Sequence, residues 1–184
     1  MEQFLTAEER GALLKAARES IEARLRGERP GRAEASGELA ERHGAFVTLT
    51  RNGRLRGCIG FVIAERPLLE TVREAAQAAA FQDPRFPPLR AAELPEIRLE
   101  ISVLSVPRPV RGLEEIRVGT HGLIVRRGPR SGLLLPQVAT EYGWDRDTFL
   151  SHTCAKAGLP EDCWREPGTT IEIFGAEVFG ERGA

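Results

Sequence analysis

Residues 45–63 contain two strand-like runs that are separated only by Asn52 and Gly53. An Asn-Gly pair tolerates the positive φ angles of a type I′ turn, whose twist matches that of the strands it joins. The runs 45–51 and 54–63 are therefore predicted to form a β-hairpin. The sequence therefore predicts antiparallel strand pairing within residues 45–63.

The same turn also sets a register for the hairpin. Pairing outward from it places Leu49 opposite Arg56 and Val47 opposite Cys58. We therefore expect the face that carries Cys58 to carry apolar residues as well, and to be covered.

Further helix and strand signals follow along the chain. Thr6 and Glu9 form a capping-box pattern that opens a helix, and Gly27 suits its end. Pro67 suits the first position of a second helix, over 68–81. The other predicted elements are a strand over 97–104, a hairpin of 122–127 and 132–135, a short helix over 136–142, a helix from Asp145 to about residue 157, and a closing strand over 169–181.

The order of these elements, α-ββ-α-β-ββ-α-β, contains hairpins rather than repeated crossovers. It predicts an α+β fold with a mainly antiparallel sheet flanked by helices. The 184 residues suit one domain, 1–184. A smaller second lobe, built either from the N-terminal helix or from 105–135, remains an open alternative.

Charge and aromatic content argue against a nucleic-acid binder. The chain has 26 basic and 27 acidic residues, a net charge of −1, and 6% aromatic residues. Neither a basic stripe nor a stacking platform for bases is visible in the sequence.

Cysteine usage and hydropathy indicate the compartment. Cys58, Cys154 and Cys163 are too few and too scattered to predict a disulfide framework. The N-terminal sequence lacks the basic and apolar regions of a signal peptide, and no apolar run approaches the roughly 20 residues of a membrane span. We therefore expect a cytoplasmic protein with no membrane segment.

No familiar cofactor or metal motif is present. His152 and Cys154 are two residues apart and diverge on a helix, and Cys154 and Cys163 lack the spacing of a zinc site. The sequence contains no G-x-S-x-G, P-loop, H-E-x-x-H or G-x-G-x-x-G pattern. We predict no metal site, and the cofactor stays unknown.

The run Leu55-Arg-Gly-Cys-Ile-Gly60 is the most unusual local sequence. Gly57 and Gly60 within one strand often mark a bulge or a close approach of backbone or ligand. Alternation puts Arg56 on the face of Cys58, where a cation would favour the reactive thiolate. Cys58 is thus either a packed small hydrophobe or a functional thiol.

The second candidate is the loop Asp83-Pro-Arg-Phe-Pro-Pro88. Its prolines hold the loop in a preset shape and so position Asp83 and Arg85 for binding, unless the two charges simply pair. Gln137 lies near a helix N-terminus, where an anion could bind or where it could act as a cap. Glu100 and Ser102 share a polar strand face that we expect to face solvent.

The blocks GAFVTL (44–49), LRGCIG (55–60), DPRF (83–86), EISVLS (100–105) and LLPQV (134–138) resemble those of the AMMECR domain family. With the FL…C-x-K-A-G run at 149–158 they stand in the family's order, and the resemblance covers 44–179. It implies an α/β fold with a larger domain and a smaller lobe, and hallmark residues near the groove between them. It assigns no reaction. It does imply a pathway shared with Memo-like and radical-SAM proteins.

These observations leave three functional hypotheses. The leading one is a domain that binds or processes a small molecule in a groove lined by Arg56, Gly57, Cys58, Gly60, Asp83, Arg85 and Gln137. If it is catalytic, Cys58 is the nucleophile. The second is a non-catalytic protein-interaction or scaffold domain, and the third, less favoured, is an RNA-related regulatory domain.

Overall fold

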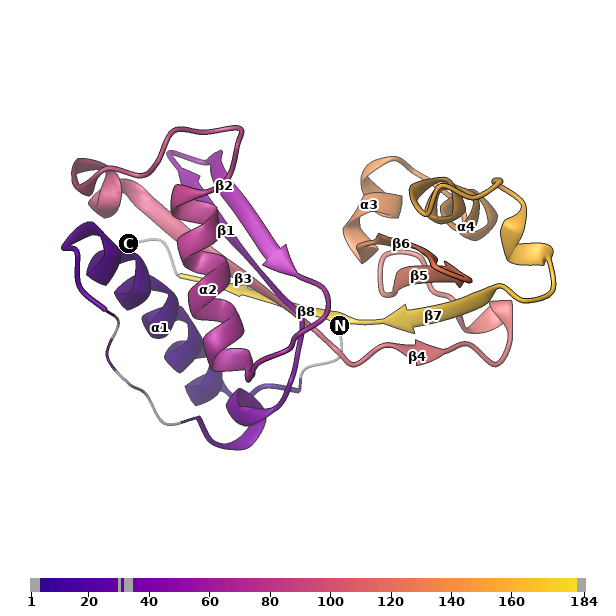
Figure 1. Ribbon diagram of the computed structural model, residues 1–184, viewed down its shortest axis with the longest axis horizontal. Helices are drawn as coiled ribbons and strands as arrows, with labels where there is room; N and C mark the ends of the chain where they lie inside the picture. Colours follow the sequence, from indigo (N-terminus) through magenta and orange to yellow (C-terminus); the bar gives the residue numbers. More distant parts are fainter. Residues whose placement is uncertain (1–3, 30, 32–34, 182–184) are drawn as a thin grey trace. The chain divides into compact units, whose positions relative to one another are not determined.

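A computed structural model describes residues 4–29, 31 and 35–181. Within this range the chain divides into two compact units, which Figure 1 shows. The larger unit comprises the described residues up to Leu104 and those from Glu177 onward, and the smaller unit is Ser105–Ala176. The second lobe is therefore more extensive than 105–135, and the N-terminal helix belongs to the larger unit.

The larger unit packs two helices on a four-stranded sheet (Figure 1). Its strands lie in the order β2-β1-β3-β8, and β1 runs antiparallel to both neighbours. The elements are α1 (Ala7–Leu25), η1 (Gly37–Ala40), β1 (Ala45–Arg51), β2 (Arg54–Phe61), α2 (Leu68–Phe81), η2 (Ala91–Glu96), β3 (Ile97–Leu104) and β8 (Ala176–Gly180). The predicted α+β fold is confirmed.

The helices of this unit begin and end where local chemistry places them. The capping box at α1 is confirmed, since Thr6 Oγ1 accepts from the N–H of Glu9 and the Glu9 carboxylate accepts from the N–H of Thr6. Gly27 follows with a φ of 73°. Pro67 is the N-cap of α2 rather than its first residue, one position from the prediction.

The predicted register of the first hairpin is wrong by one residue. Leu49 pairs with Gly57 and Val47 with Ile59, because the register shifts between Leu49 and Thr50. Arg56 is the extra residue of this β-bulge.

The bulge changes which face Cys58 occupies. Cys58 pairs with Thr48, on the face opposite the fully buried Val47 and Leu49, and is itself only partly buried. The observed register therefore does not place Cys58 on the covered apolar face that was predicted.

The smaller unit has its own four-stranded sheet, with strands in the order β4-β7-β5-β6 (Figure 1). Its elements are β4 (Arg108–Pro109), η3 (Leu113–Glu115), β5 (Gly122–Arg127), β6 (Arg130–Leu134), α3 (Pro136–Glu141), α4 (Arg146–Lys156), η4 (Cys163–Arg165) and β7 (Thr170–Phe174). A separate apolar core that includes Leu123, Val125, Phe149 and Leu150 holds these elements together. The second hairpin is confirmed, although β6 begins two residues earlier than predicted.

The closing strand predicted over 169–181 is two strands. β7 lies in the sheet of the smaller unit and β8 in that of the larger unit, and Gly175 separates them. The alternation breaks just before Gly175, because Ile173 and Phe174 are consecutive apolar residues and both are buried.

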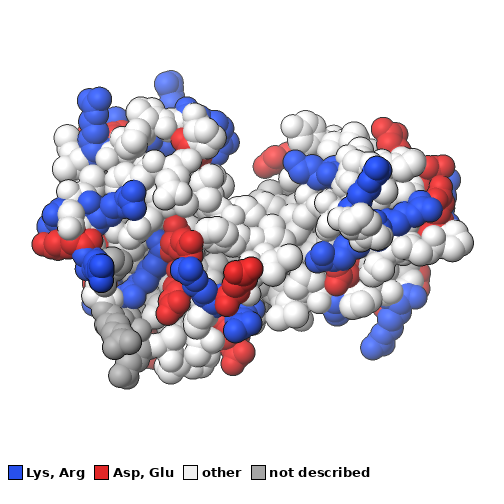
Figure 2. All heavy atoms as spheres, in the orientation of Figure 1, with Lys and Arg blue, Asp and Glu red and all other residues white. Residues whose placement is uncertain are grey.

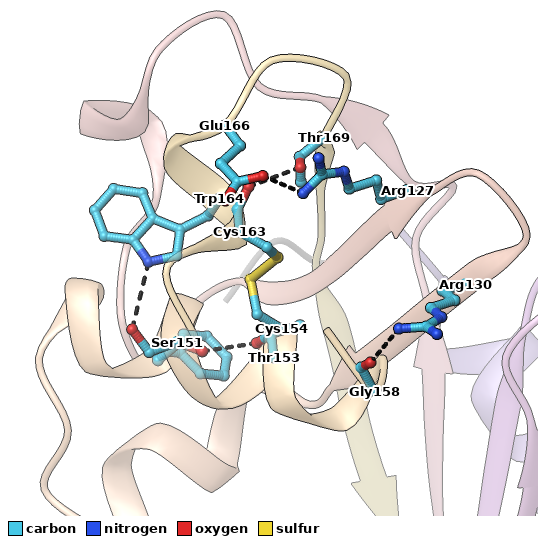
Figure 3. The surroundings of a disulfide bond; sticks show 11 residues. Arg127, Arg130, Ser151, Thr153, Cys154, Gly158, Cys163, Trp164, Glu166 and Thr169 are labelled. Carbon is cyan, nitrogen blue, oxygen red and sulfur yellow. Dashed lines mark hydrogen bonds and ion pairs between the residues drawn. A yellow bond between two sulfur atoms is a disulfide. The ribbon is translucent and has the colours of Figure 1, made fainter. Parts of the chain in front are cut away.

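A disulfide joins Cys154 on α4 to Cys163 on η4, although the sequence predicted none (Figure 3). Both cysteines are fully buried. Nearby, the Thr169 hydroxyl donates to the carbonyl oxygen of Cys163 at 2.7 Å, and the Trp164 indole donates to Ser151 at 3.4 Å. Spacing arguments missed this pair because the contact depends on how the chain returns after α4.

Replacing Cys154 and Cys163 together with alanine is expected to lower the free energy of unfolding of the smaller unit by about 2 kcal/mol, because a short cross-linked loop is released. Urea titration followed by tryptophan fluorescence measures this, since both tryptophans, Trp144 and Trp164, lie in this unit. A reductant should shift the wild-type transition in the same way and leave the double variant unchanged. An unshifted wild-type curve would contradict the expectation.

The distribution of charged side chains and the hydropathy of the helices agree with what the sequence predicted. Figure 2 shows basic and acidic side chains interspersed on the face in view. Among the described residues, no helix is long and apolar enough to span a membrane.

Candidate functional site

The edge strand β2 is capped at Cys58 by two side chains from the loop after α2. The N–H of Cys58 donates to Oδ2 of Asp83 at 2.9 Å, and Nη2 of Arg85 donates to the carbonyl oxygen of Cys58 at 3.3 Å. An edge strand leaves such groups without a neighbouring strand. Asp83 and Arg85 therefore supply the acceptor and the donor that a further strand would have provided.

Asp83 and Arg85 also bind each other. Nε and Nη2 of Arg85 donate to the two carboxylate oxygens at 2.9 and 2.7 Å, a bidentate pair, and the N–H of Arg85 donates to Oδ1 at 3.1 Å. The Asp83 side chain is 2% exposed and that of Arg85 is 55% exposed. The hydrogen bonds from Arg85 hold the pKa of Asp83 well below its usual range, so Asp83 is an anion at neutral pH.

The Cys58 thiol lies on the sheet face away from the helices, where Thr48 Oγ1 donates to its Sγ at 3.3 Å. Thr48 also pairs with Glu100 of β3, so a thiol, a hydroxyl and a carboxylate occupy one row across three strands. The hydrogen bonds to Asp83 raise the pKa of Arg85, so its guanidinium stays charged where it contacts the carbonyl oxygen of Cys58.

Arg56, expected to be the cationic neighbour of Cys58, is bound to other groups. Its Nε and Nη2 donate to the two oxygens of Glu93 at 2.9 and 3.1 Å, and Nη2 also donates to the carbonyl oxygen of Pro87 at 2.9 Å. Arg56 lowers the pKa of Glu93 to about 2. Its Nη1 is buried without a hydrogen-bond partner among the described residues. Arg56 therefore ties the bulge of β2 to Pro87 and to Glu93 of η2, and the arginine that contacts Cys58, at its carbonyl oxygen, is Arg85.

Gly57 and Gly60 provide close packing. A Cβ on Gly57 would lie 2.1 Å from the carbonyl oxygen of Ala79 in α2, so this glycine sets the approach of helix to sheet. A Cβ on Gly60 would lie 2.4 Å from the ring of Phe46 on β1. The close approach predicted at the two glycines is thus to the protein's own atoms.

The remaining sequence candidates belong to the smaller unit or have other roles. Gln137 is in the smaller unit, at the second residue of α3, and its carbonyl oxygen accepts from the Thr140 hydroxyl at 2.8 Å. Glu100 is exposed as predicted, whereas Ser102 is buried. The described residues contain no group of three or more His, Cys, Asp or Glu side chains able to hold a metal ion.

A comparison of the sequence with models of known protein families covers the residues described above. A model of the AMMECR1 family matches residues 14–179. The chain belongs to the AMMECR1 family. A protein of Methanothermobacter thermautotrophicus is 47% identical over 187 residues, 97% of each chain. One of Methanopyrus kandleri is 48% identical over 191 residues, covering 98% of this chain and 92% of its own.

The crystal structure of an uncharacterised Pyrococcus horikoshii protein superposes on this AMMECR1 chain with a TM-score of 0.78. That protein is 44% identical, and the match covers 92% of this chain and 90% of the other. The similarity supports the α+β architecture described above.

In this AMMECR1 chain the hallmark LRGCIG and the DPRF block meet at the edge of one sheet. Sequence reasoning missed two members of the cluster, Thr48 and Glu93. Thr48 could have been found only with the bulge in place, because the regular register puts another residue opposite Cys58. Nothing local marks Glu93, which reaches Arg56 from 37 residues away.

Proposed function

We propose that this AMMECR1 chain binds a small anionic molecule at Arg85 and presents it to the Cys58 thiol as the reacting group. The observation that carries the proposal is the state of Arg85, whose guanidinium is fixed by Asp83 yet more than half exposed beside Cys58.

Arg85 is prepared for an anion by the way it is held. Its Nε and Nη2 are engaged by Asp83 and by the Cys58 carbonyl, and its Nη1 makes no hydrogen bond within the described part of the chain. A guanidinium fixed in this way loses little side-chain entropy when its free edge meets a carboxylate or a similar oxyanion. We assign Arg85 the binding role and Asp83 the role of positioning it.

Cys58 is suited to act on such a ligand. Its Sγ accepts a hydrogen bond from Thr48, and its carbonyl oxygen accepts one from Arg85, so an anion held at Arg85 lies next to a residue type able to act as a nucleophile. The exposed carboxylate of Glu100 lies in the same cross-strand row as the thiol. The roles are therefore nucleophile for Cys58, anion binding for Arg85 and hydrogen bonding to the sulfur for Thr48.

The proposal includes the pathway that the family resemblance implies, with Memo-like and radical-SAM proteins as partners that make or consume the same small molecule. A scaffold role predicts instead that Cys58→Ser keeps all function in cells. An RNA-related role predicts salt-dependent retention of RNA at about 50 mM salt.

Alkylation kinetics test the proposal directly, because Cys58 is the free cysteine of the chain and the other two are joined. Iodoacetate carries a carboxylate and iodoacetamide does not, and with either reagent the thiolate forms a carbon–sulfur bond and displaces iodide. We expect the rate ratio of iodoacetate to iodoacetamide to be about fivefold higher for the native protein than for the urea-unfolded protein, the effect of one partly exposed charge pair. The ratio should fall as salt is added.

Variants locate the effect. Arg85→Gln should bring the ratio to the unfolded value or below it, because the Asp83 anion is then unpaired, whereas Arg66→Gln, which removes an exposed arginine paired with Glu74 in the same unit, should leave it unchanged. Far-UV circular dichroism shows whether each variant is folded. Equal ratios in native and unfolded wild-type protein would refute the proposal without any variant.

A further inference from the structure

The smaller unit contains a pocket of about 850 Å³ that is independent of Cys58. Its walls come from the segment leading into β4, from η3 and the chain after it, and from the end of β7. Volumes of this size are typical of small-molecule sites. Its charged wall carries Arg108, Glu114, Glu115 and Arg117.

Two of these four charges form an ion pair with each other. Nη1 of Arg108 donates to Oε2 of Glu115 at 2.6 Å, and this hydrogen bond lowers the pKa of Glu115. Arg117 and Glu114 remain as one cation and one anion, both exposed, and neither forms an ion pair with any described residue. His121 also faces the pocket, where its Nδ1 accepts from the N–H of Arg117 at 3.2 Å.

Apolar surface lies next to the charged wall. Val106 lines the pocket and is 67% exposed, whereas Ile173 and Phe174 of β7, which also line it, are each only 2% exposed. The exposed Val106 side chain gains from being covered by an apolar group. Within the described residues, the pocket thus offers one unpaired cation, one unpaired anion and the exposed apolar side chain of Val106.

From this combination we infer that the pocket binds a zwitterionic ligand of the amino-acid or short-peptide class. Arg117 binds the carboxylate, Glu114 binds the ammonium group, and an apolar ligand side chain packs on Val106. The inference does not rest on the proposed reactivity of Cys58, and either can fail without the other.

Isothermal titration calorimetry with leucyl-leucine as the probe tests this inference. We expect saturable binding of the free dipeptide, and binding at least about tenfold weaker for both N-acetyl-leucyl-leucine and leucyl-leucine amide, because each blocked peptide lacks one charge. Absence of binding, or equal binding of all three peptides, would overturn the inference.

Substitutions assign the two charges. Arg117→Gln should weaken leucyl-leucine to the level of its amide and leave the affinity for the amide unchanged. Glu114→Gln should weaken it to the level of the acetylated peptide and leave that affinity unchanged. Arg111→Gln, an exposed arginine of the same segment outside the pocket lining, is the matched control and should change none of the affinities.

Gly112→Ala gives a further test without removing a charge. Gly112 has extended backbone, which alanine adopts freely, but its Cβ would lie 2.1 Å from the carboxylate of Glu114. The flexible carboxylate should be displaced and affinity for the free dipeptide reduced, with the acetylated peptide unaffected. An unchanged affinity for the free dipeptide would contradict the role of Glu114.

Discussion

Replacing Gly57 with alanine is expected to lower the free energy of unfolding of the larger unit by about 3 kcal/mol, near the upper end of what overpacking costs. The added Cβ would lie 2.1 Å from the carbonyl oxygen of Ala79 and 3.1 Å from its carbonyl carbon. These are main-chain atoms of α2, so no side chain can move aside to relieve the overlap. Helix and edge strand must separate, which opens the core between them.

Urea unfolding followed by far-UV circular dichroism measures this change. Gly11→Ala is the matched control, because Gly11 lies within α1 and a Cβ added there would meet no atom within 4 Å. That variant should gain about 0.5–1 kcal/mol from helix propensity. Tryptophan fluorescence reports the smaller unit and should change less than the dichroism does. A Gly57→Ala protein as stable as the wild type would show that α2 does not approach β2 as described.

Replacing Asp83 with asparagine is expected to lower the free energy of unfolding by about 3 kcal/mol, because the buried carboxylate accepts hydrogen bonds from Cys58 and, with charge on both sides, from Arg85. The amide keeps one acceptor oxygen but cannot accept hydrogen bonds from both Cys58 and Arg85 at two oxygens, and it offers no charge to the guanidinium. The edge of β2 then loses its cap. Asp147→Asn, at a half-exposed carboxylate paired with Arg146, should have little effect by comparison.

The two carboxylates Asp83 and Glu93 predict how the stability of the larger unit depends on pH. The pKa of Asp83 and that of Glu93 are both lower in the folded protein than their usual values. Their contribution to stability is therefore fully present above about pH 5 and is lost as pH falls through about 4 toward the folded pKa of Glu93, about 2. Wild type and Asp83→Asn should thus approach each other in stability over this range. A constant difference from about pH 7 to about pH 2 would contradict the assignment.

Local signals in the sequence predicted most of the helices and strands. The apolar positions Leu13, Ala17 and Ile21 of α1 are fully buried, as their spacing predicted. The Asn52-Gly53 turn has φ angles of 52° and 73°, as an Asn-Gly turn requires. These features depend on interactions between residues that are close in the sequence, and a sequence pattern predicts such local structure well.

The candidate site was only partly predictable. The sequence singled out the LRGCIG and DPRF blocks, and the structure brings them together at Cys58. The sequence also suggested ligand contacts for residues that in fact contact the protein itself. Arg56 binds Glu93, and Gly57 packs against α2. A motif records that a residue type is needed at a position, but not which neighbour needs it.

The sequence by itself determined the element types, the antiparallel hairpins and the family. Only the tertiary structure decided the bulge at Arg56, the face of Cys58, the break between β7 and β8, and the Cys154–Cys163 disulfide. The physical reason is the range of the interactions involved. Turns, caps and periodicity act within a few residues, whereas register, edge capping and cross-linking depend on which distant segments the packed core brings into contact.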